Sequence, residues 1–537
     1  MLSYRKLAMR VLGRPLHTEG IDSPRPASQR AAAFILTAAM LTTLAAPAFA
    51  DIWHIENGDI TISAGESGNN VTQNNNTTYG DTNTIITNQN KDTASSHTVT
   101  IEAKDKDDKV EVTLKDVNID TSSRNKAAVS VTGEGDTNIK LDGDNALKSD
   151  IYRSGIYGSG SGSLTISGGE NDSLTAQGGS GANGISSSGS LTISGGTVTA
   201  NGDDGGRGIS SSGSVTISGG STVTANGGSG TISGGDGIWS GGGVTISGGS
   251  TVTANGGNGG SLVGGDGIRS GGGLTVSDGT VTAKGGNGDS KDGYGGDGIR
   301  SGGVVTISGN TVNAAGGYGG KVGGYGICSF DRVAISGGTV EAAGGNGSTG
   351  GGSGIYSSVI DLSGSLELTA KAGSPNGKAL SQKGSELVLD TIKDKLGPGA
   401  KVTATDADGK VIDQVSTPRP VEPEESSSSS DGGSATPSAP ASPLPGLTVT
   451  DKDGQRISYT STQSGNTLTV CVGRFTASFR ISLAALRQLR AEGIETIAFQ
   501  TILCSTTLSV DELLAMGGED AEAVLTHRLT DSSLTVG

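Results

Sequence analysis

Short runs of alternating apolar and polar residues recur along most of this chain. In the run LTIS the Leu and Ile side chains point to one side, and in TVTA the Val points to one side while both Thr point to the other. A period of two is that of a half-buried β-strand, so both runs predict short strands. Looser runs of the same kind occupy 99–143. No single run can bury its apolar side alone, so each must pack against copies of itself.

A Gly-Ile pair recurs in step with these strands, at intervals of 24 to 31 residues. Each unit continues with a strand like LTIS, a glycine turn, a strand like TVTA and a glycine-rich loop. Such units can stack as coils of a right-handed parallel β-helix, with glycine supplying left-handed backbone at the corners. We therefore predict an all-β, glycine-rich solenoid over 99–415, preceded by a cap or irregular first coils over 51–98. The isoleucines of the pairs form one predicted inward ladder: Ile156, Ile185, Ile209, Ile238, Ile268, Ile299, Ile327 and Ile355.

The two ends of the chain differ from the repeats. Residues 1–50 contain a basic stretch, the apolar run Ala31–Ala46 and a small-x-small site ending at Ala50, which together predict a cleaved secretory signal peptide. Residues 416–446 are rich in Pro and Ser and predict an extended linker. Residues 447–537 predict a small α+β module of unknown role, with one helix capped by Ser482 and another that begins at Ser509.

Composition narrows the classes of partner. The chain has 537 residues, 94 of them Gly, only 3% aromatic residues and a formal net charge of −16. So acidic a chain is a poor partner for nucleic acid or anionic membranes, and no segment after residue 50 is apolar enough to span a bilayer. Three cysteines are too few for a disulfide scaffold. Cys471 and Cys504 could pair in an oxidising compartment, which would leave Cys328 single.

The residue after each Gly-Ile pair is predicted to point outward, in a row that follows the stacked coils. Its members are Tyr157, Ser186, Ser210, Trp239, Arg269, Arg300, Cys328 and Tyr356. Aromatic faces stack on sugar rings and guanidinium groups bind carboxylates, so Tyr157, Trp239, Arg269, Arg300 and Tyr356 are candidate polysaccharide-binding residues. The alternative is a solvated face with incidental aromatic residues.

Aspartate precedes the Gly-Ile pair at Asp236, Asp266 and Asp297, each within GGDGI. Stacked carboxylates repel one another unless a cation lies between them, which makes these residues candidate calcium ligands. The alternative is a corner Asp that accepts hydrogen bonds from the amides of its own turn.

The phrases SGGTVTA and GIxSSGSLTISGG resemble those of carbohydrate-binding β-helix proteins, adhesin-like, from the surfaces of clostridial-type bacteria. The resemblance covers about Val99 to Leu389 and implies a secreted, calcium-associated protein that binds plant polysaccharides. A β-helix polysaccharide lyase is the main alternative, with Arg269 beside Asp266 or Arg300 beside Asp297 as its base and ligand. A purely structural surface spacer is a third possibility. We expect a non-catalytic binding protein.

Overall fold

The computed structural model describes residues 51–418, 447–450, 456–457, 459–464, 466–472, 477–501, 505–516, 521–527 and 532–536. The chain divides into two compact units, one up to Glu424 and the other from Glu425. The predicted signal peptide, nearly all of the predicted linker and Cys504 lie outside the described residues, so the predictions made for them stay predictions. No helix within the described ranges is long and apolar enough to cross a membrane.

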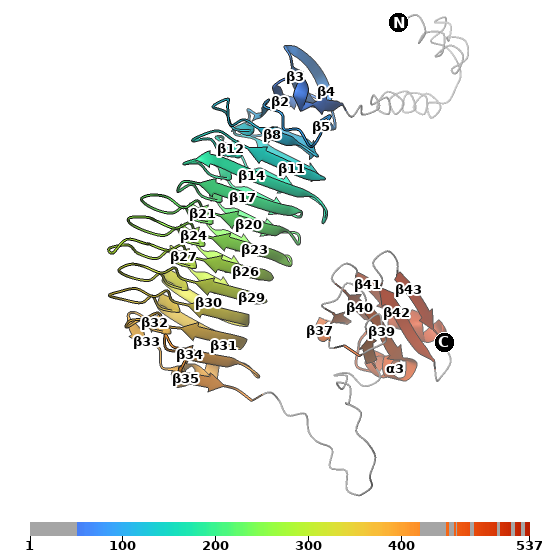
Figure 1. Ribbon diagram of the computed structural model, residues 1–537. Helices are drawn as coiled ribbons and strands as arrows, with labels where there is room; N and C mark the ends of the chain where they lie inside the picture. The colour runs from blue at the N-terminus through green and yellow to red at the C-terminus, as the bar shows by residue number, and fades with distance from the viewer. Residues whose placement is uncertain are drawn as a thin grey trace, which may run out of the picture. The chain divides into compact units, whose positions relative to one another are not determined.

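The first unit is a parallel β-helix of about 13 turns, as the repeats predict, and 53% of the structure is strand. Its coils stack from β2 to β35 in one continuous solenoid (Figure 1). The right-handed sense of the coil stays a prediction. Three parallel sheets run along the stack, and the long strands β30 (Ile327–Ala343) and β31 (Ile355–Lys371) pass through all three.

The first sheet contains the strands that follow the Gly-Ile pairs, with their counterparts in the outer coils. Besides β30 and β31 these are β2 (Ile60–Gly65), β6 (Val99–Ala103), β9 (Val129–Gly133), β12 (Ile156–Gly158), β15 (Ile185–Ser187), β18 (Ile209–Ser211), β21 (Ile238–Ser240), β24 (Ile268–Ser270), β27 (Ile299–Ser301) and β32 (Leu380–Gln382).

The second sheet contains the LTIS-like strands. They are β1 (Ile52–His54), β5 (Thr84–Thr87), β7 (Lys109–Lys115), β10 (Asp136–Asp142), β13 (Leu164–Ser167), β16 (Leu191–Ser194), β19 (Val215–Ser218), β22 (Val244–Ile246), β25 (Leu274–Val276) and β28 (Val305–Ile307).

The third sheet contains the TVTA-like strands. They are β8 (Asn118–Asp120), β11 (Asp144–Lys148), β14 (Ser173–Ser180), β17 (Thr197–Asp203), β20 (Thr222–Asn226), β23 (Ser250–Asn255), β26 (Gly279–Lys284), β29 (Thr311–Ala315) and β34 (Lys401–Thr405).

The interior is filled by aliphatic ladders, in the register that the repeats predict. Each isoleucine of the predicted ladder pairs with the next, and all are fully buried. The same ladder continues to Ile60, Val99 and Val129 at one end and to Leu380 at the other. Stacked residues lie about 4.8 Å apart. Each coil therefore covers the apolar side of the coil before it.

Antiparallel strands cover the two ends of the stack. At the first end β2 pairs with β3 (Gly68–Gln73), which pairs with β4 (Asn76–Asp81); a short 3-10 turn, Ile55–Asn57, lies beside them. At the other end β32 pairs with β33 (Ser385–Glu386) and β34 pairs with β35 (Val411–Ser416), around a 3-10 segment, Leu389–Lys395. The β34–β35 hairpin ends the solenoid.

Glycine has two separate roles in the solenoid, and the sequence analysis predicted only the first. At the corner between the LTIS-like and TVTA-like strands, Gly195 and Gly196 have φ of +90° and +72°, which L-residues resist. In the long loops, Gly257 and Gly286 do not have such positive φ values. A Cβ on Gly286 would instead collide with the carbonyl oxygen of Gly257 in the coil before.

These loop glycines form two facing rows that run along the stack, and we call them the glycine rows. A zigzag of backbone hydrogen bonds of 2.8 Å joins them: Gly257 donates to Gly235, Gly265 donates to Gly257 and Gly286 donates to Gly265. The pattern repeats in the following coils. The first row is Gly235, Gly265, Gly296, Gly324 and Gly352; the second is Gly257, Gly286, Gly317, Gly345 and Gly373. The loops are therefore a packed layer.

The described residues of the second unit form two four-stranded sheets and two helices, which matches the predicted α+β module. The first sheet has the order β36 (Leu447–Thr450), β39 (Ala477–Ser482), β42 (Glu522–His527) and β43 (Ser532–Val536); the second has the order β37 (Thr460–Ser464), β38 (Thr467–Cys471), β40 (Thr496–Gln500) and β41 (Ser505–Ser509). The helices are α3 (Leu483–Ala491) and α4 (Val510–Met516).

Polar contacts fix the helix starts of the second unit as predicted. The Ser482 hydroxyl accepts a hydrogen bond from the Ala485 amide, and the Ser509 hydroxyl accepts one from the Glu512 amide. In the core of this unit the His527 ring lies 4.8 Å from the Phe499 ring. The Cys471 thiol donates to Gln500.

Candidate functional site

The predicted outward row exists as a continuous column on the first sheet, and we call it the outward column. Its members pair in register from coil to coil: Thr61, Thr100, Ser130, Tyr157, Ser186, Ser210, Trp239, Arg269, Arg300, Cys328, Tyr356 and Ser381. Buried aliphatic or small residues flank each member along its strand, so the members face away from the core. The structure therefore brings the five candidate sugar-binding residues onto one face.

In the middle of the column an indole and two guanidinium groups follow one another. Trp239 is half-buried, and the guanidinium of Arg207 lies 4.4 Å from its ring centroid. Arg269 is exposed, whereas Arg300 is half-buried with its Nη1 3.5 Å from Asp297 Oδ2. The sequence analysis missed Arg207. Arg207 could have been found from its position in the sequence, because it stands directly before a Gly-Ile pair, as Asp236 does one coil later.

Two members of the column point outward as predicted but are covered by neighbouring groups. Cys328 is only 1% exposed and Ser210, earlier in the column, only 7%. Beside Cys328 the rings of Tyr325 and Tyr356 stack at 4.9 Å, and the Arg300 guanidinium lies 5.4 Å from the Phe330 ring centroid. Burial raises the pKa of the Cys328 thiol to about 12, so it stays protonated at neutral pH. Tyr356 is therefore half-buried in a stacked pair with Tyr325.

The three aspartates form a second row beside the column, two residues before each inward isoleucine. They are 6%, 5% and 4% exposed in the order Asp236, Asp266, Asp297. Asp236 Oδ1 accepts the backbone amide of Asp266 at 2.9 Å, and Asp266 Oδ1 accepts that of Asp297 at 2.8 Å. Asp297 Oδ1 accepts the amide of Tyr325 at 2.7 Å. Each carboxylate thus bonds the following coil, not the amides of its own turn.

Two of these carboxyls, those of Asp266 and Asp297, have raised pKa values. Burial, then the Asp297 and Asp236 charges, raise the pKa of Asp266 to about 8. Burial also raises the pKa of Asp297 to about 6, although the Tyr325 amide and Arg300 oppose the change. Asp297 Oδ2 is buried without a hydrogen bond. Asp266 is therefore protonated at neutral pH, which reduces its repulsion with the neighbouring carboxyls.

The same contacts bear on the predicted calcium site. Calcium takes six to eight oxygen ligands. Each Asp Oδ1 is already bonded to an amide, and the Oδ2 atoms of Asp236 and Asp297 lie 3.1 Å and 3.5 Å from Arg207 and Arg300. Within the described ranges no group of three or more His, Cys, Asp or Glu residues is arranged to hold a metal ion. Calcium stays a prediction that these contacts do not support.

A cleft of about 290 Å³ opens at the first end of the outward column. Its floor includes Thr100, Ser130 and Tyr157, and its wall includes Lys126 and Arg153. Tyr157 is 43% exposed. Tyr157 was predicted from the sequence, but the two cations were not. Their shared position, three residues before Val129 and Ile156, could have identified them as neighbours in successive coils.

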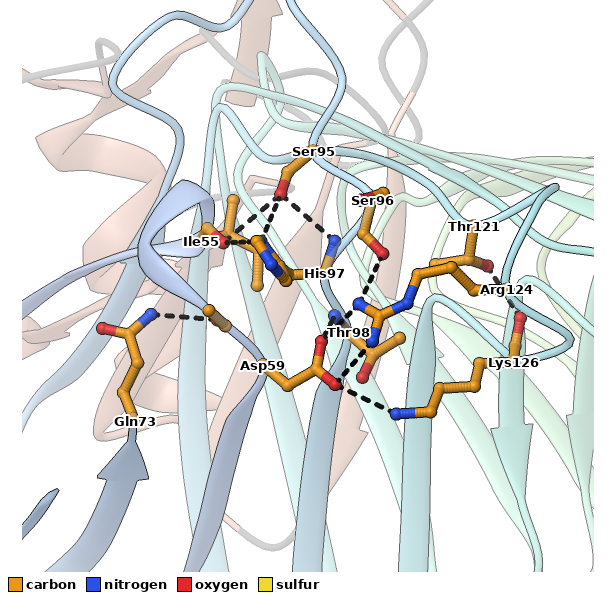
Figure 2. A network of polar contacts seen from close by, with 11 residues as sticks. Ile55, Asp59, Gln73, Ser95, Ser96, His97, Thr98, Thr121, Arg124 and Lys126 are labelled. Atoms are coloured by element: carbon orange, nitrogen blue, oxygen red, sulfur yellow. Dashed lines mark hydrogen bonds and ion pairs between the residues drawn. The ribbon is translucent and has the colours of Figure 1, made fainter. Parts of the chain in front are cut away.

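An ion-pair network borders this cleft (Figure 2). Arg124 binds both carboxylate oxygens of Asp59, at 2.7 and 3.1 Å, and Lys126 Nζ lies 3.0 Å from Asp59 Oδ2. Burial alone would raise the pKa of Asp59, but hydrogen bonds from Arg124 and Lys126 outweigh it and lower the pKa to about 2. Asp59 is therefore a fixed negative charge that orders the wall of the cleft.

No family model matches the chain, and neither the curated proteins nor the solved structures gave a match.

Proposed function

We propose that this protein is a secreted, surface-associated bacterial protein that binds polysaccharide and has no catalytic activity. The observation that carries the proposal is the outward column, in which Tyr157, Trp239 and Arg269 face away from the core in register. An extended glycan presents sugar faces and carboxylates along its length, and these match aromatic and guanidinium groups at coil spacing. The resemblance of the repeats to carbohydrate-binding β-helix proteins supports the same function.

The contacts of the arginines favour binding over a lyase reaction. A lyase base must lose its proton near neutral pH. Burial lowers the pKa of Arg300, but the Asp297 and Asp266 charges outweigh it, so that its pKa is raised. Arg300 is therefore a poor base, and its ion pair with Asp297 is a structural contact. Arg269 is exposed, as a group that contacts an acidic ligand would be.

A glycan array with the chain from Asp51 onward tests the proposal, with and without calcium. Trp239→Ala and Arg269→Ala should each weaken retention of acidic glycans about ten-fold, because aromatic and Arg contacts dominate binding energy. The matched control is Thr245→Ala, which changes an exposed residue of the same coil on the second sheet.

Three other outcomes would contradict part or all of this proposal. Retention that both variants leave unchanged would remove the outward column from consideration. Release of unsaturated uronides, detected by ultraviolet absorption, would support a lyase. If no glycan is retained, the remaining function is that of a structural spacer, in which the solenoid presents the second unit.

A further inference from the structure

We propose that the cleft beside Tyr157 is a separate subsite for one anionic sugar residue, with Arg153 and Lys126 binding its carboxylate. The inference rests on the proposed function, since it names the ligand class for one end of the outward column. It concerns residues that the repeats themselves do not include.

Two cations line the cleft of a strongly acidic protein, and one of them, Lys126, is paired with Asp59. The chain carries a formal net charge of −16, yet the cleft is lined by two cations and by no carboxylate. Three hydroxyl groups line it as well, from Thr98, Thr100 and Ser130. Hydroxyl groups both donate and accept hydrogen bonds, as sugar hydroxyls do. The lining thus fits a ligand that carries both an anionic group and hydroxyls.

The two cations replace glycine at one defined position of the repeat. Lys126 and Arg153 stand three residues before Val129 and Ile156, which pair in the first sheet. The next coil carries Ala182 at this position, and the coils from Gly235 onward carry the glycines of the first glycine row, against which the adjacent loops pack. The cleft therefore lies in the coils that precede the glycine rows.

Arg153 is positioned to bind a ligand. Its Nε donates to Asn125 Oδ1 at 3.2 Å, and the guanidinium forms no ion pair with any described residue. The backbone amide of Asn125 in turn donates a hydrogen bond to Asp150 Oδ2 at 2.6 Å. The contact through Nε leaves both terminal nitrogens for a carboxylate, which guanidinium binds with two parallel hydrogen bonds.

Lys126 and Tyr157 complete the subsite. Lys126 gives one hydrogen bond to Asp59, and an ammonium has three donors, so two remain. Tyr157 offers an exposed ring on the floor of the cleft, against which the apolar face of a sugar can stack. The subsite should therefore bind a sugar acid more tightly than a neutral sugar, which lacks the carboxylate. It should also bind a sugar acid more tightly than an inorganic anion, which lacks the sugar ring.

Isothermal titration of the chain from Asp51 onward tests this, with methyl glucuronide, methyl glucoside and sodium sulfate as probes. Methyl glucuronide should bind most tightly, and added salt should weaken it. Arg153→Gln should weaken glucuronide binding roughly ten-fold to a hundred-fold, because it removes a charge-assisted hydrogen-bond pair. Tyr157→Ala should weaken both glycosides. Lys140→Gln is the control, since it removes an exposed positive charge from β10 on the second sheet.

Several results would overturn the subsite. These are equal affinity for the glucuronide and the glucoside, sulfate binding as tight as glucuronide binding, no glucuronide binding at millimolar concentration, or a glucuronide affinity that Arg153→Gln leaves unchanged. If an array glycan is still retained and still depends on Trp239, only the subsite fails. If no glycan is retained and no probe binds, the proposed function fails with it.

Discussion

Replacing Asp266 by Asn should remove a destabilising effect of rising pH on the solenoid. The Asp266 side chain is 5% exposed and lies between two other carboxyls. Its amide-bonding role survives the change, because an Asn oxygen can accept the Asp297 amide as Asp266 does at 2.8 Å. Asn183 already does this in an earlier coil, where its Oδ1 accepts the Arg207 amide at 2.8 Å. We therefore expect the variant to fold.

The direction of the pH effect follows from the raised pKa. An unfolded Asp releases its proton near pH 4, whereas folded Asp266 keeps it up to about pH 8. Between these values the folded state binds one more proton, so stability is greatest at low pH and falls as pH rises. The loss is about 1.4 kcal/mol for each pH unit, or about 3 kcal/mol between pH 5 and pH 7. Asp297 adds a loss of the same sign below about pH 6.

Urea unfolding followed by circular dichroism at pH 5, 6 and 7 measures this. Relative to the unmodified chain, Asp266→Asn should gain about 3 kcal/mol between pH 5 and pH 7. Asp289→Asn, at an exposed position in the next loop, should gain nothing. A difference between Asp266→Asn and the unmodified chain that stays constant with pH would refute the reasoning. A stabilisation by calcium that Asp266→Asn abolishes would support the predicted calcium site instead.

Three further predictions follow from other contacts. Gly286→Ala should destabilise the solenoid by about 1–3 kcal/mol, because its Cβ meets the Gly257 carbonyl. Gly350→Ala, whose Cβ would meet only Val322 methyl groups at 3.8 Å, should be close to neutral; equal urea midpoints would contradict the glycine rows. Iodoacetamide at neutral pH should leave Cys328 unlabelled in the folded chain and label it in urea, as mass spectrometry can show. Burial lowers the pKa of His527, so the pKa measured by NMR titration should lie below the ordinary value near 6.5. Because the unfolded chain then binds the proton more tightly, the second unit should lose stability as pH falls. A measured pKa at or above 6.5 would contradict this.

The aliphatic ladders could be predicted from the sequence because their signal is local. Alternation in LTIS fixes which side chains point inward, and the constant spacing of Gly-Ile pairs fixes which residues stack. The outward column followed from the same register, so Tyr157, Trp239 and Arg269 were placed correctly on one face. Nothing more than strand geometry was needed.

What the sequence did not show depends on contacts between loops. Glycine at a corner and glycine in close contact look alike in a sequence, so the sequence predicted only the left-handed corners and not the glycine rows. Cys328 stands in an outward position, but Tyr325 from the neighbouring row stacks on Tyr356 and helps to close that part of the column. Lys126 lies in a coil without the repeated phrases, and Arg153 lies just before the first Gly-Ile pair, so only their matching register relates them.

Because every middle coil meets the next through the same strand registers and the same pair of glycines, any two of these coils have compatible surfaces. Loss or duplication of one complete unit in the gene would therefore rejoin matching surfaces and change the length of the solenoid by about 4.8 Å. The spacing between the Tyr157 cleft and Trp239, now three coils, can thus be altered by recombination between repeats, without any new solution for the core.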